Sequence, residues 1–146
     1  MSVGAPGAAE AAPAVPHPRQ TAQLIGQDDA QTTLRRAWES GRLPHAWLLT
    51  GARGIGKATL AYRFATFVLA GPADADGGLF GDTPRDLAAA SDSPAARQVT
   101  AGSHPDLFVL EPGRVNPETN RVSHEILAGH VRRAVHFCFM TPAAAP

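Results

Sequence analysis

The sequence of 146 residues has only one cysteine, only one lysine and a formal net charge of zero. Each of these features excludes certain kinds of site or makes certain binding partners improbable. A single cysteine, Cys138, excludes an intrachain disulfide and any zinc site made of cysteines alone, and this usage fits a reducing cytoplasm. The formal net charge is zero, so bulk electrostatics do not indicate a strong binder of nucleic acid or membranes. No apolar run approaches the length of a membrane span.

The single lysine is placed where a compact positive charge has a specific use. Lys57 ends the sequence Gly-Ala-Arg-Gly-Ile-Gly-Lys, and every other basic side chain apart from histidine is an arginine. The spacing of Gly51, Gly56 and Lys57 is that of a phosphate-binding loop, whose backbone N–H groups surround an anion at a helix N-terminus. An ammonium group can enter such a loop more easily than a broad guanidinium. The residues predicted to bind ATP are Gly51, Gly54, Ile55, Gly56, Lys57, Ala58 and Thr59.

The flanking residues give the loop its expected setting. Residues 46–50 form a short apolar run typical of a buried parallel strand, and Trp47 to Leu49 are expected to be its most buried residues. A helix is predicted to follow the loop. The residues on its apolar face are Leu60, Ala61, Phe64, Phe67 and Val68. The same pattern is also compatible with a glycine-rich turn that joins a strand to a helix and binds nothing.

The residue after the lysine argues against magnesium-dependent hydrolysis. A working loop has Ser or Thr at this position, and its hydroxyl completes the Mg²⁺ shell. Ala58 has no oxygen to offer, and Thr59 comes one residue late, which is a rotation of about 100° on a helix. We therefore expect phosphate binding on Lys57 and the backbone, weak or absent hydrolysis, and neither a catalytic residue nor a metal ligand.

The remainder of the chain divides by composition. Residues 1–20 are rich in Ala, Pro and Gly without the pattern of a secretory signal, and they are predicted to be a disordered leader. Residues 21–146 are the predicted nucleotide-binding domain, with a polar, cysteine-free insertion at 71–103. Its aspartates could form a carboxylate metal site, but the glycines around them favour a solvated loop.

Three further helices and a second strand are expected. One helix runs from Asp28 to Gly41, with Asp28 or Asp29 as its cap and Ala30, Leu34 and Trp38 on one face. A short helix covers Pro94 to Ala101, and residues 107–110 form the second strand. The last helix starts from a cap at Ser123. Its apolar face comprises Leu127, Val131, Ala134 and Val135, and its histidines, His124, His130 and His136, are too far apart to be ligands of one metal.

Several longer stretches resemble one family. They are LIGQ at 24–27, GRLPHAWLLTGARGIGKATLAYRFATFVLAG at 41–71, AGSHPDLFVL at 101–110 and HVRRAVHFCFMTP at 130–142. In these stretches the chain resembles the bacterial clamp-loader branch of AAA+ proteins, and above all the delta-prime subunits of DNA polymerase III. An alanine after the lysine fits this resemblance, because many delta-prime subunits have degenerate loops and serve as scaffold.

The resemblance implies an α/β fold, that of the P-loop NTPases of the AAA+ class, here truncated before the Walker B strand because the sequence stops at Pro146. It implies a cytoplasmic replication protein that helps to load the sliding clamp on primed DNA together with the other clamp-loader subunits. As part of a DNA polymerase holoenzyme it would itself be a weak or inactive ATPase. The zinc of many relatives is not expected, because residues 71–103 lack the four cysteines.

Two alternatives remain open at this point. The chain could be an active motor ATPase, such as the hydrolysing clamp-loader subunit or a helicase-like AAA+ protein, and Ala58 argues against this. It could also be an inactive truncated product. In the family sheet the strands corresponding to 46–50 and 107–110 are not neighbours, so the resemblance also implies unpaired strand edges and low stability.

Overall fold

The computed structural model of the protein describes residues 15–21, 23–74, 87, 93–113 and 125–143. Its elements are the 3-10 helix η1 (Pro18–Gln20) and the α-helices α1 (Asp28–Glu39), α2 (Lys57–Asp74), α3 (Pro94–Ala101) and α4 (Ala128–Cys138). No β-strand is present among these described residues. No helix in the described part is long and apolar enough to cross a membrane.

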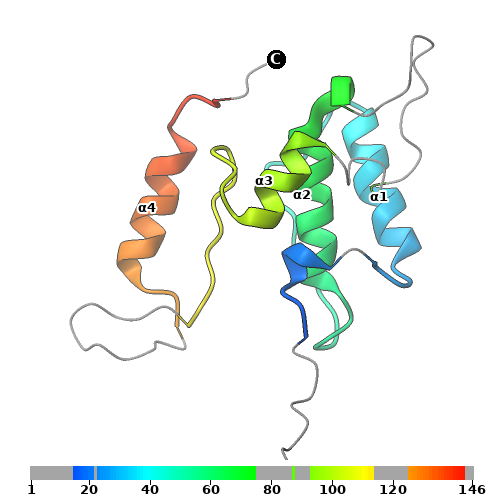
Figure 1. Ribbon diagram of the computed structural model, residues 1–146, viewed down its shortest axis with the longest axis horizontal. Coiled ribbons are helices and arrows are strands. Elements are labelled where there is room, and N and C mark those ends of the chain that lie inside the picture. The colour runs from blue at the N-terminus through cyan, green and yellow to red at the C-terminus, as the bar shows by residue number, and fades with distance from the viewer. Residues whose placement is uncertain (1–14, 22, 75–86, 88–92, 114–124, 144–146) are drawn as a thin grey trace, which may run out of the picture.

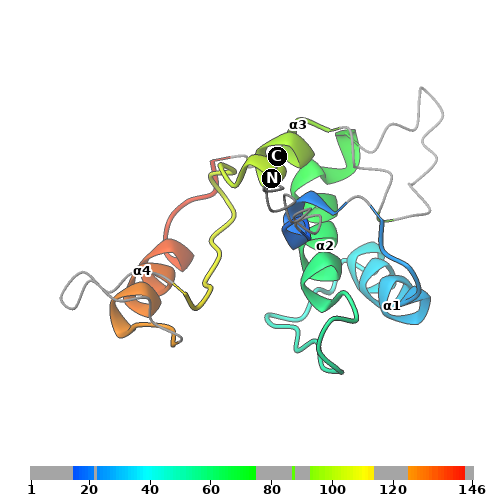
Figure 2. The same cartoon turned by 60° about the horizontal axis from the view of Figure 1, so that its bottom comes forward.

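Helix α2 is the centre of the arrangement. It packs against α1 on one side and against α3 and η1 on the other, while η1 also contacts α3 (Figures 1 and 2). Helix α4 stands apart, across the extended segment that follows α3, and contacts none of the other described helices. The core around α2 is therefore what holds the loop before Lys57 in place.

The core forms between the predicted apolar faces of α1 and α2. Its buried side chains are Leu34, Leu60, Phe67 and Leu87, with Leu24, Ala30, Trp38, Leu49 and Phe64 packed around them. The predicted face of α1 is confirmed, since Ala30, Leu34 and Trp38 all contact this core. The predicted cap of α1 is wrong: both aspartates lie inside the first turn, where their charges favour the helix N-terminus, and Gln27 is the N-cap.

Helix α2 begins at Lys57 as predicted and ends after a kink at Gly71, where φ is +65°. Leu60 and Phe67 are buried on its inner face. Ala61, Phe64 and Val68 of the predicted apolar face lie on the adjoining open side of the helix, where Ala61 is exposed. They line an apolar cavity of about 370 Å³ together with Leu43, Trp47 and Leu49.

The bounds of α3 match the prediction because its sequence contains complete start and stop signals. The Ser93 hydroxyl accepts a hydrogen bond from the Ala96 N–H at 3.0 Å, and Pro94 occupies the first turn. Gly102 ends the helix in the left-handed region at φ +73°. The Arg19 guanidinium lies against Gly102, where a Cβ atom would be 2.5 Å from Nη1. Thus η1 and α3 meet at Gly102, where the positive φ favours glycine and any larger residue would displace the Arg19 guanidinium.

The two predicted strands are not formed, which corrects the sequence analysis. Trp47 is 39% exposed and Leu48 87% exposed, and only Leu49 packs against the core. A strand is stabilised by hydrogen bonds to a neighbour. Among the described residues, no backbone hydrogen bond joins 46–50 or 107–110 to another extended segment. Without these bonds the apolar run at 46–50 remains an extended, partly exposed segment.

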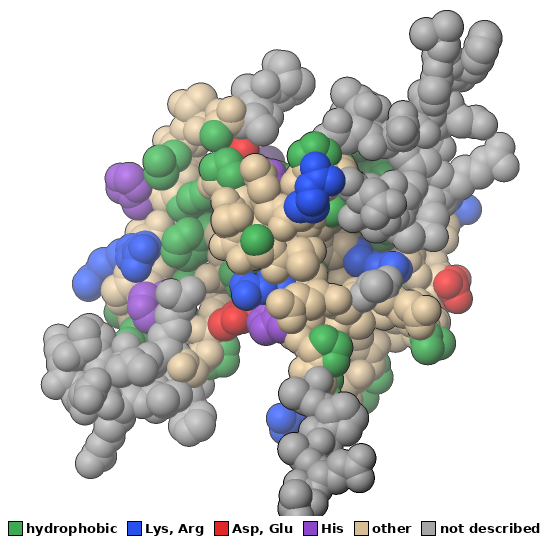
Figure 3. Space-filling view, viewed as in Figure 1, with side chains coloured by type: hydrophobic (Ala, Val, Ile, Leu, Met, Phe, Trp, Pro, Cys, Tyr) green, Lys and Arg blue, Asp and Glu red, His purple; other side chains and the backbone are tan. Residues whose placement is uncertain are grey.

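Helix α4 differs from the prediction in its start and in its packing. It begins at Ala128 after the N-cap Leu127, whereas the predicted cap, Ser123, lies outside the described residues, as does His124. None of its residues is buried, and Val131 and Val135 are about half exposed. Figure 3 shows apolar, arginine and histidine side chains together over this helix. Its anchor is Phe137, whose ring lies 5.4 Å from that of Phe108.

The predicted leader and insertion are described only in part. Residues 1–14 lie outside the described residues, whereas residues 18–20, which the sequence analysis assigned to the leader, form η1 on the surface of α2 and α3. Of the insertion, 75–86 and 88–92 lie outside the description. In the described remainder of the chain no group of three or more His, Cys, Asp or Glu side chains could hold a metal ion.

Candidate functional site: the loop before α2

The structure brings the predicted phosphate-binding residues together in one tight loop. Gly51, Gly54 and Gly56 all have positive φ angles, of +138°, +86° and +91°. At Gly51 and Gly56 a Cβ atom would also lie 2.6 Å from the Cδ1 atom of Ile55 or of Leu24, respectively, so these side chains would have to move. The positive φ angles favour glycine at both positions of the motif.

Lys57 closes the loop from the first turn of α2. Its ammonium donates hydrogen bonds to the carbonyl oxygens of Gly51 at 2.9 Å and Ala52 at 2.6 Å. The Gly56 carbonyl accepts from the Leu60 N–H at 2.9 Å, which starts the helix. The first N–H groups of a helix have no partner inside the helix. Lysine, glycines and helix N-terminus thus form a group that fits a phosphate anion.

The two residues after Lys57 lie on different sides of α2. Ala58 is exposed, and Thr59 is buried with 8% of its surface accessible. An exposed methyl group therefore occupies the position at which a hydroxyl would complete a magnesium shell. The donor set fits a phosphate, but its side chains at 57–59 do not fit a phosphate-bound Mg²⁺ ion.

Sequence reasoning assigned no role in the site to Gln27, although the structure joins it to the loop. The Gln27 side-chain amide donates a hydrogen bond to the Ile55 carbonyl at 3.3 Å, across 28 residues of sequence. Gln27 is also the single non-glycine residue with positive φ in the described residues, at +64°. Gly26 before it was the one local signal, since glycine often marks a turn of this kind.

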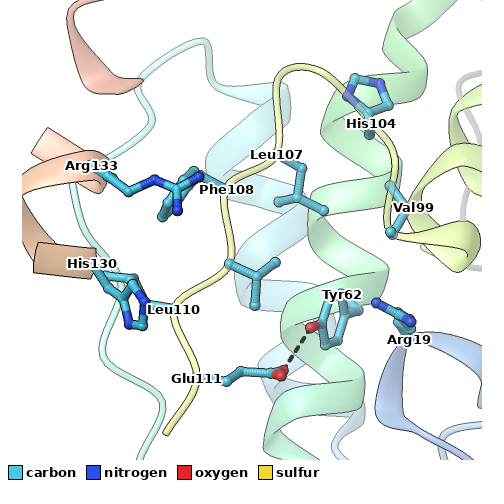
Figure 4. A pocket seen from close by; sticks show the side chains of 12 residues that line it. Arg19, Tyr62, Val99, His104, Leu107, Phe108, Leu110, Glu111, His130 and Arg133 are labelled. Carbon is cyan, nitrogen blue, oxygen red and sulfur yellow. Dashed lines mark hydrogen bonds between the residues drawn. The ribbon is translucent and has the colours of Figure 1, made fainter. Parts of the chain in front are cut away.

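A second polar cluster fixes the segment after α3 to the body of the molecule. The Tyr62 hydroxyl donates a hydrogen bond to the Glu111 carboxylate at 3.0 Å, as Figure 4 shows. His17 Nε2 lies 3.5 Å from the same carboxylate oxygen, and its ring packs edge-on against Tyr62. The cluster therefore links η1, α2 and residue 111. Tyr62 and Glu111 line a cavity of about 220 Å³, with His130 and Arg133 of α4 on the opposite side of the segment (Figure 4).

The environment of Tyr62 leads to a prediction about alkaline pH. Burial and the hydrogen bond to Glu111 raise the pKa of Tyr62 above its ordinary value of 10.0, and nearby Arg19 opposes the rise. Because the folded state holds the phenolic proton more tightly, its contribution to stability is present below pH 10 and is lost as the pH rises through the raised pKa. Tyr62 is the sole tyrosine, so phenolate absorbance reports its titration alone.

We expect the folded chain to titrate at higher pH than the chain unfolded in urea. Glu111→Gln should lower the folded midpoint, because it removes the nearby negative charge. Glu39→Gln on α1 is the matched control, since Glu39 pairs with Arg35 and takes no part in the cluster. Identical midpoints in folded and unfolded chains would contradict the structural assignment.

The comparisons with known proteins match the chain to subunits of DNA polymerase III. A family model described as DNA polymerase III, delta subunit matches residues 26–142. The DNA polymerase III subunit delta' of Pseudomonas aeruginosa is 38% identical over 68 residues, which is 47% of this chain and 17% of that protein. Subunit gamma of Buchnera aphidicola is 46% identical over 44 residues, 30% of this chain and 12% of that protein.

A third relative is also a DNA polymerase III subunit that matches over a short stretch. Subunit tau/gamma of Haemophilus influenzae is 40% identical over 48 residues, 33% of this chain and 7% of that protein. The similarity thus spans between 7% and 17% of the length of these relatives. No solved structure matches the chain.

Proposed function

The chain belongs to the DNA polymerase III delta subunit family, and on that premise we propose that it acts in DNA replication as a clamp-loader subunit of the delta-prime type. In this proposal it is a cytoplasmic protein that holds neighbouring ATP-binding subunits in register while the sliding clamp is loaded on primed DNA. Its own contribution is that of a scaffold with a degenerate ATP site. The relative named delta' supports this choice within the family.

The observation that carries the scaffold proposal is the exposed methyl group of Ala58 in a loop that is otherwise complete. Lys57 and three glycines of positive φ retain what phosphate binding needs. Hydrolysis additionally needs a metal to neutralise the charge that develops on the phosphates, and the protein hydroxyl that would hold it is absent. ATP can thus be bound without being consumed.

The fold we propose is the α/β arrangement of a P-loop NTPase, with a sheet on the open face of α2. The support is the apolar cavity of about 370 Å³ along Ala61, Phe64 and Val68, opposite the extended residues at 46–50. A helix that packs on a sheet needs such an apolar stripe. Trp47 and Leu49 line the same cavity, so residues 46–50 present alternate side chains to α2 as a strand of such a sheet would.

The glycines and Lys57 of the loop also favour one other function, that of an active motor ATPase. The two functions differ in a turnover assay with purified protein and Mg²⁺–ATP. We expect no turnover above background from the chain, and Mg²⁺ should not tighten its binding of ATP. In Ala58→Ser the restored hydroxyl should make ATP binding Mg²⁺-dependent, whereas Ala61→Ser, on the same helix one turn later, should not.

Rapid hydrolysis by the unmodified chain in the absence of other subunits would contradict the scaffold proposal and favour the motor. The replication role has a separate test. The chain should assemble with the other clamp-loader subunits of its own organism. The unmodified chain and its Lys57→Ala variant should support clamp loading to the same extent. Failure to assemble would contradict the clamp-loader proposal whatever the ATP result.

A further inference from the structure

We propose that Gln27 is a positioning residue of the phosphate loop, which orients the peptide group between Ile55 and Gly56. The Gln27 side chain donates to the Ile55 carbonyl oxygen at 3.3 Å. In a trans peptide the carbonyl and the following N–H are coplanar and point in opposite directions. A hydrogen bond that draws the Ile55 carbonyl toward Gln27 therefore turns the Gly56 N–H away from Gln27. That N–H is one of the donors expected to meet a phosphate.

The backbone at Gln27 indicates that this contact has a cost. Its φ and ψ of +64° and +22° lie in the left-handed region, which residues other than Gly, Asn and Asp rarely adopt. Glutamine is also a poor choice for the N-cap of α1, and its side chain makes no capping hydrogen bond. A strained residue that does not cap its own helix but reaches the loop instead points to a role in the loop.

Neighbouring contacts hold the same segment on the loop. Leu24 lies over Gly56, so close that a Cβ atom there would be 2.6 Å from its Cδ1. From α1, the Gln31 side chain donates to the Gly26 carbonyl at 3.3 Å. The Gln31 N–H also donates to the Gln27 carbonyl at 2.9 Å, so two hydrogen bonds fix the segment 24–27 to α1, while Leu24 and Gln27 contact the loop. This arrangement allows Gln27 to define the direction of a single peptide group.

The proposal rests on the ATP-binding role proposed for the loop, but it can be measured without nucleotide. Gln27→Glu keeps the size of the side chain and replaces its donor by an acceptor, so it cannot bond to a carbonyl when ionised. Gln27→Gly removes the side chain and relieves the backbone, because glycine adopts positive φ without strain. Exposed Gln23→Glu is the matched control.

In both Gln27 variants we expect the NMR amide signal of Gly56 to shift and its ¹H–¹⁵N residual dipolar coupling to change, because the peptide group that carries this N–H loses its hydrogen bond to Gln27. The amide signals in the interior of α2 should not move, and the Tm of Gln27→Gly should be equal to or above that of the unmodified chain. ATP affinity, where the unmodified chain has it, should fall about three- to tenfold, the range for loss of one hydrogen bond. A residue that only supported the fold would lower Tm and move the signals of the helices together with those of the loop.

An unchanged Gly56 amide signal and dipolar coupling in Gln27→Gly would overturn the proposal. Signal changes throughout the helices with a lower Tm would overturn it as well, because Gln27 would then act on the fold as a whole. If the unmodified chain binds no ATP but the Gly56 signal responds as expected, the positioning role stands and the ATP site fails. The two proposals are in this way tested separately.

Discussion

Replacing Lys57 by alanine is expected to abolish ATP binding by the chain. The ammonium is the one lysine charge in the protein, and it lies 2.6–2.9 Å from two carbonyl oxygens of the loop. Without it, phosphate oxygens would face these carbonyls with only the backbone N–H groups to attract them. Charge-assisted hydrogen bonds to phosphate are about twice as strong as neutral ones, so a loss of at least about tenfold in affinity is expected. Calorimetric titration with ATP at moderate salt measures this loss.

Two variants make the Lys57 experiment specific. Arg53→Ala removes the other basic side chain of residues 51–57, which is exposed, and should change the affinity little. Lys57→Arg keeps the charge but replaces the compact ammonium, which bonds to the Gly51 and Ala52 carbonyls at once, by a planar fork, and it should bind nearly as weakly as the alanine variant. Equal and measurable affinity in the unmodified chain and in Lys57→Ala would show that the loop is not the ATP site.

The helices could be predicted from the sequence because their signals are local. Ser93, Pro94 and Gly102 define both ends of α3 within ten residues, and Lys57 begins α2 directly after the glycines. The loop residues could be predicted for the same reason, since the motif is a spacing within seven positions. At the start of α1 the local signal was misread, because Asp28 and Asp29 lie in the first turn and Gln27 is the N-cap.

The strands and Gln27 could not be predicted in this way, because both depend on distant parts of the chain. The apolar run at 46–50 becomes a strand only beside a partner, and in its absence Leu48 is 87% exposed. The role of Gln27 depends on a hydrogen bond across 28 residues and on a left-handed backbone that its side chain does not suggest. The resemblance did include residues 24–27, but as a pattern without a physical role.

Phe67→Ala is expected to have the largest effect on stability. The ring is 4% exposed, packs against Leu34, Leu60 and Leu87, and meets the Trp38 indole edge-on at a centroid distance of 6.2 Å. Truncating a buried phenylalanine costs about 3–5 kcal/mol, and a domain has only about 5–15 kcal/mol in total. Because α2 carries this core and also the loop, the variant should lose cooperative unfolding in urea and ATP binding together.

Leu48→Ala is the matched control, since it also truncates a large apolar side chain near the loop but one that is 87% exposed. Its free energy of unfolding should change by less than about 0.5 kcal/mol, as surface substitutions usually do. Urea unfolding followed by circular dichroism measures both variants. A cost for Leu48→Ala close to that for Phe67→Ala would mean that residues 46–50 are a buried strand in solution, because only a side chain in a packed core loses that much on truncation. A small cost for Leu48→Ala and a large one for Phe67→Ala would place the stabilising contacts between α1 and α2, and the loop would then depend on the helices alone for its position.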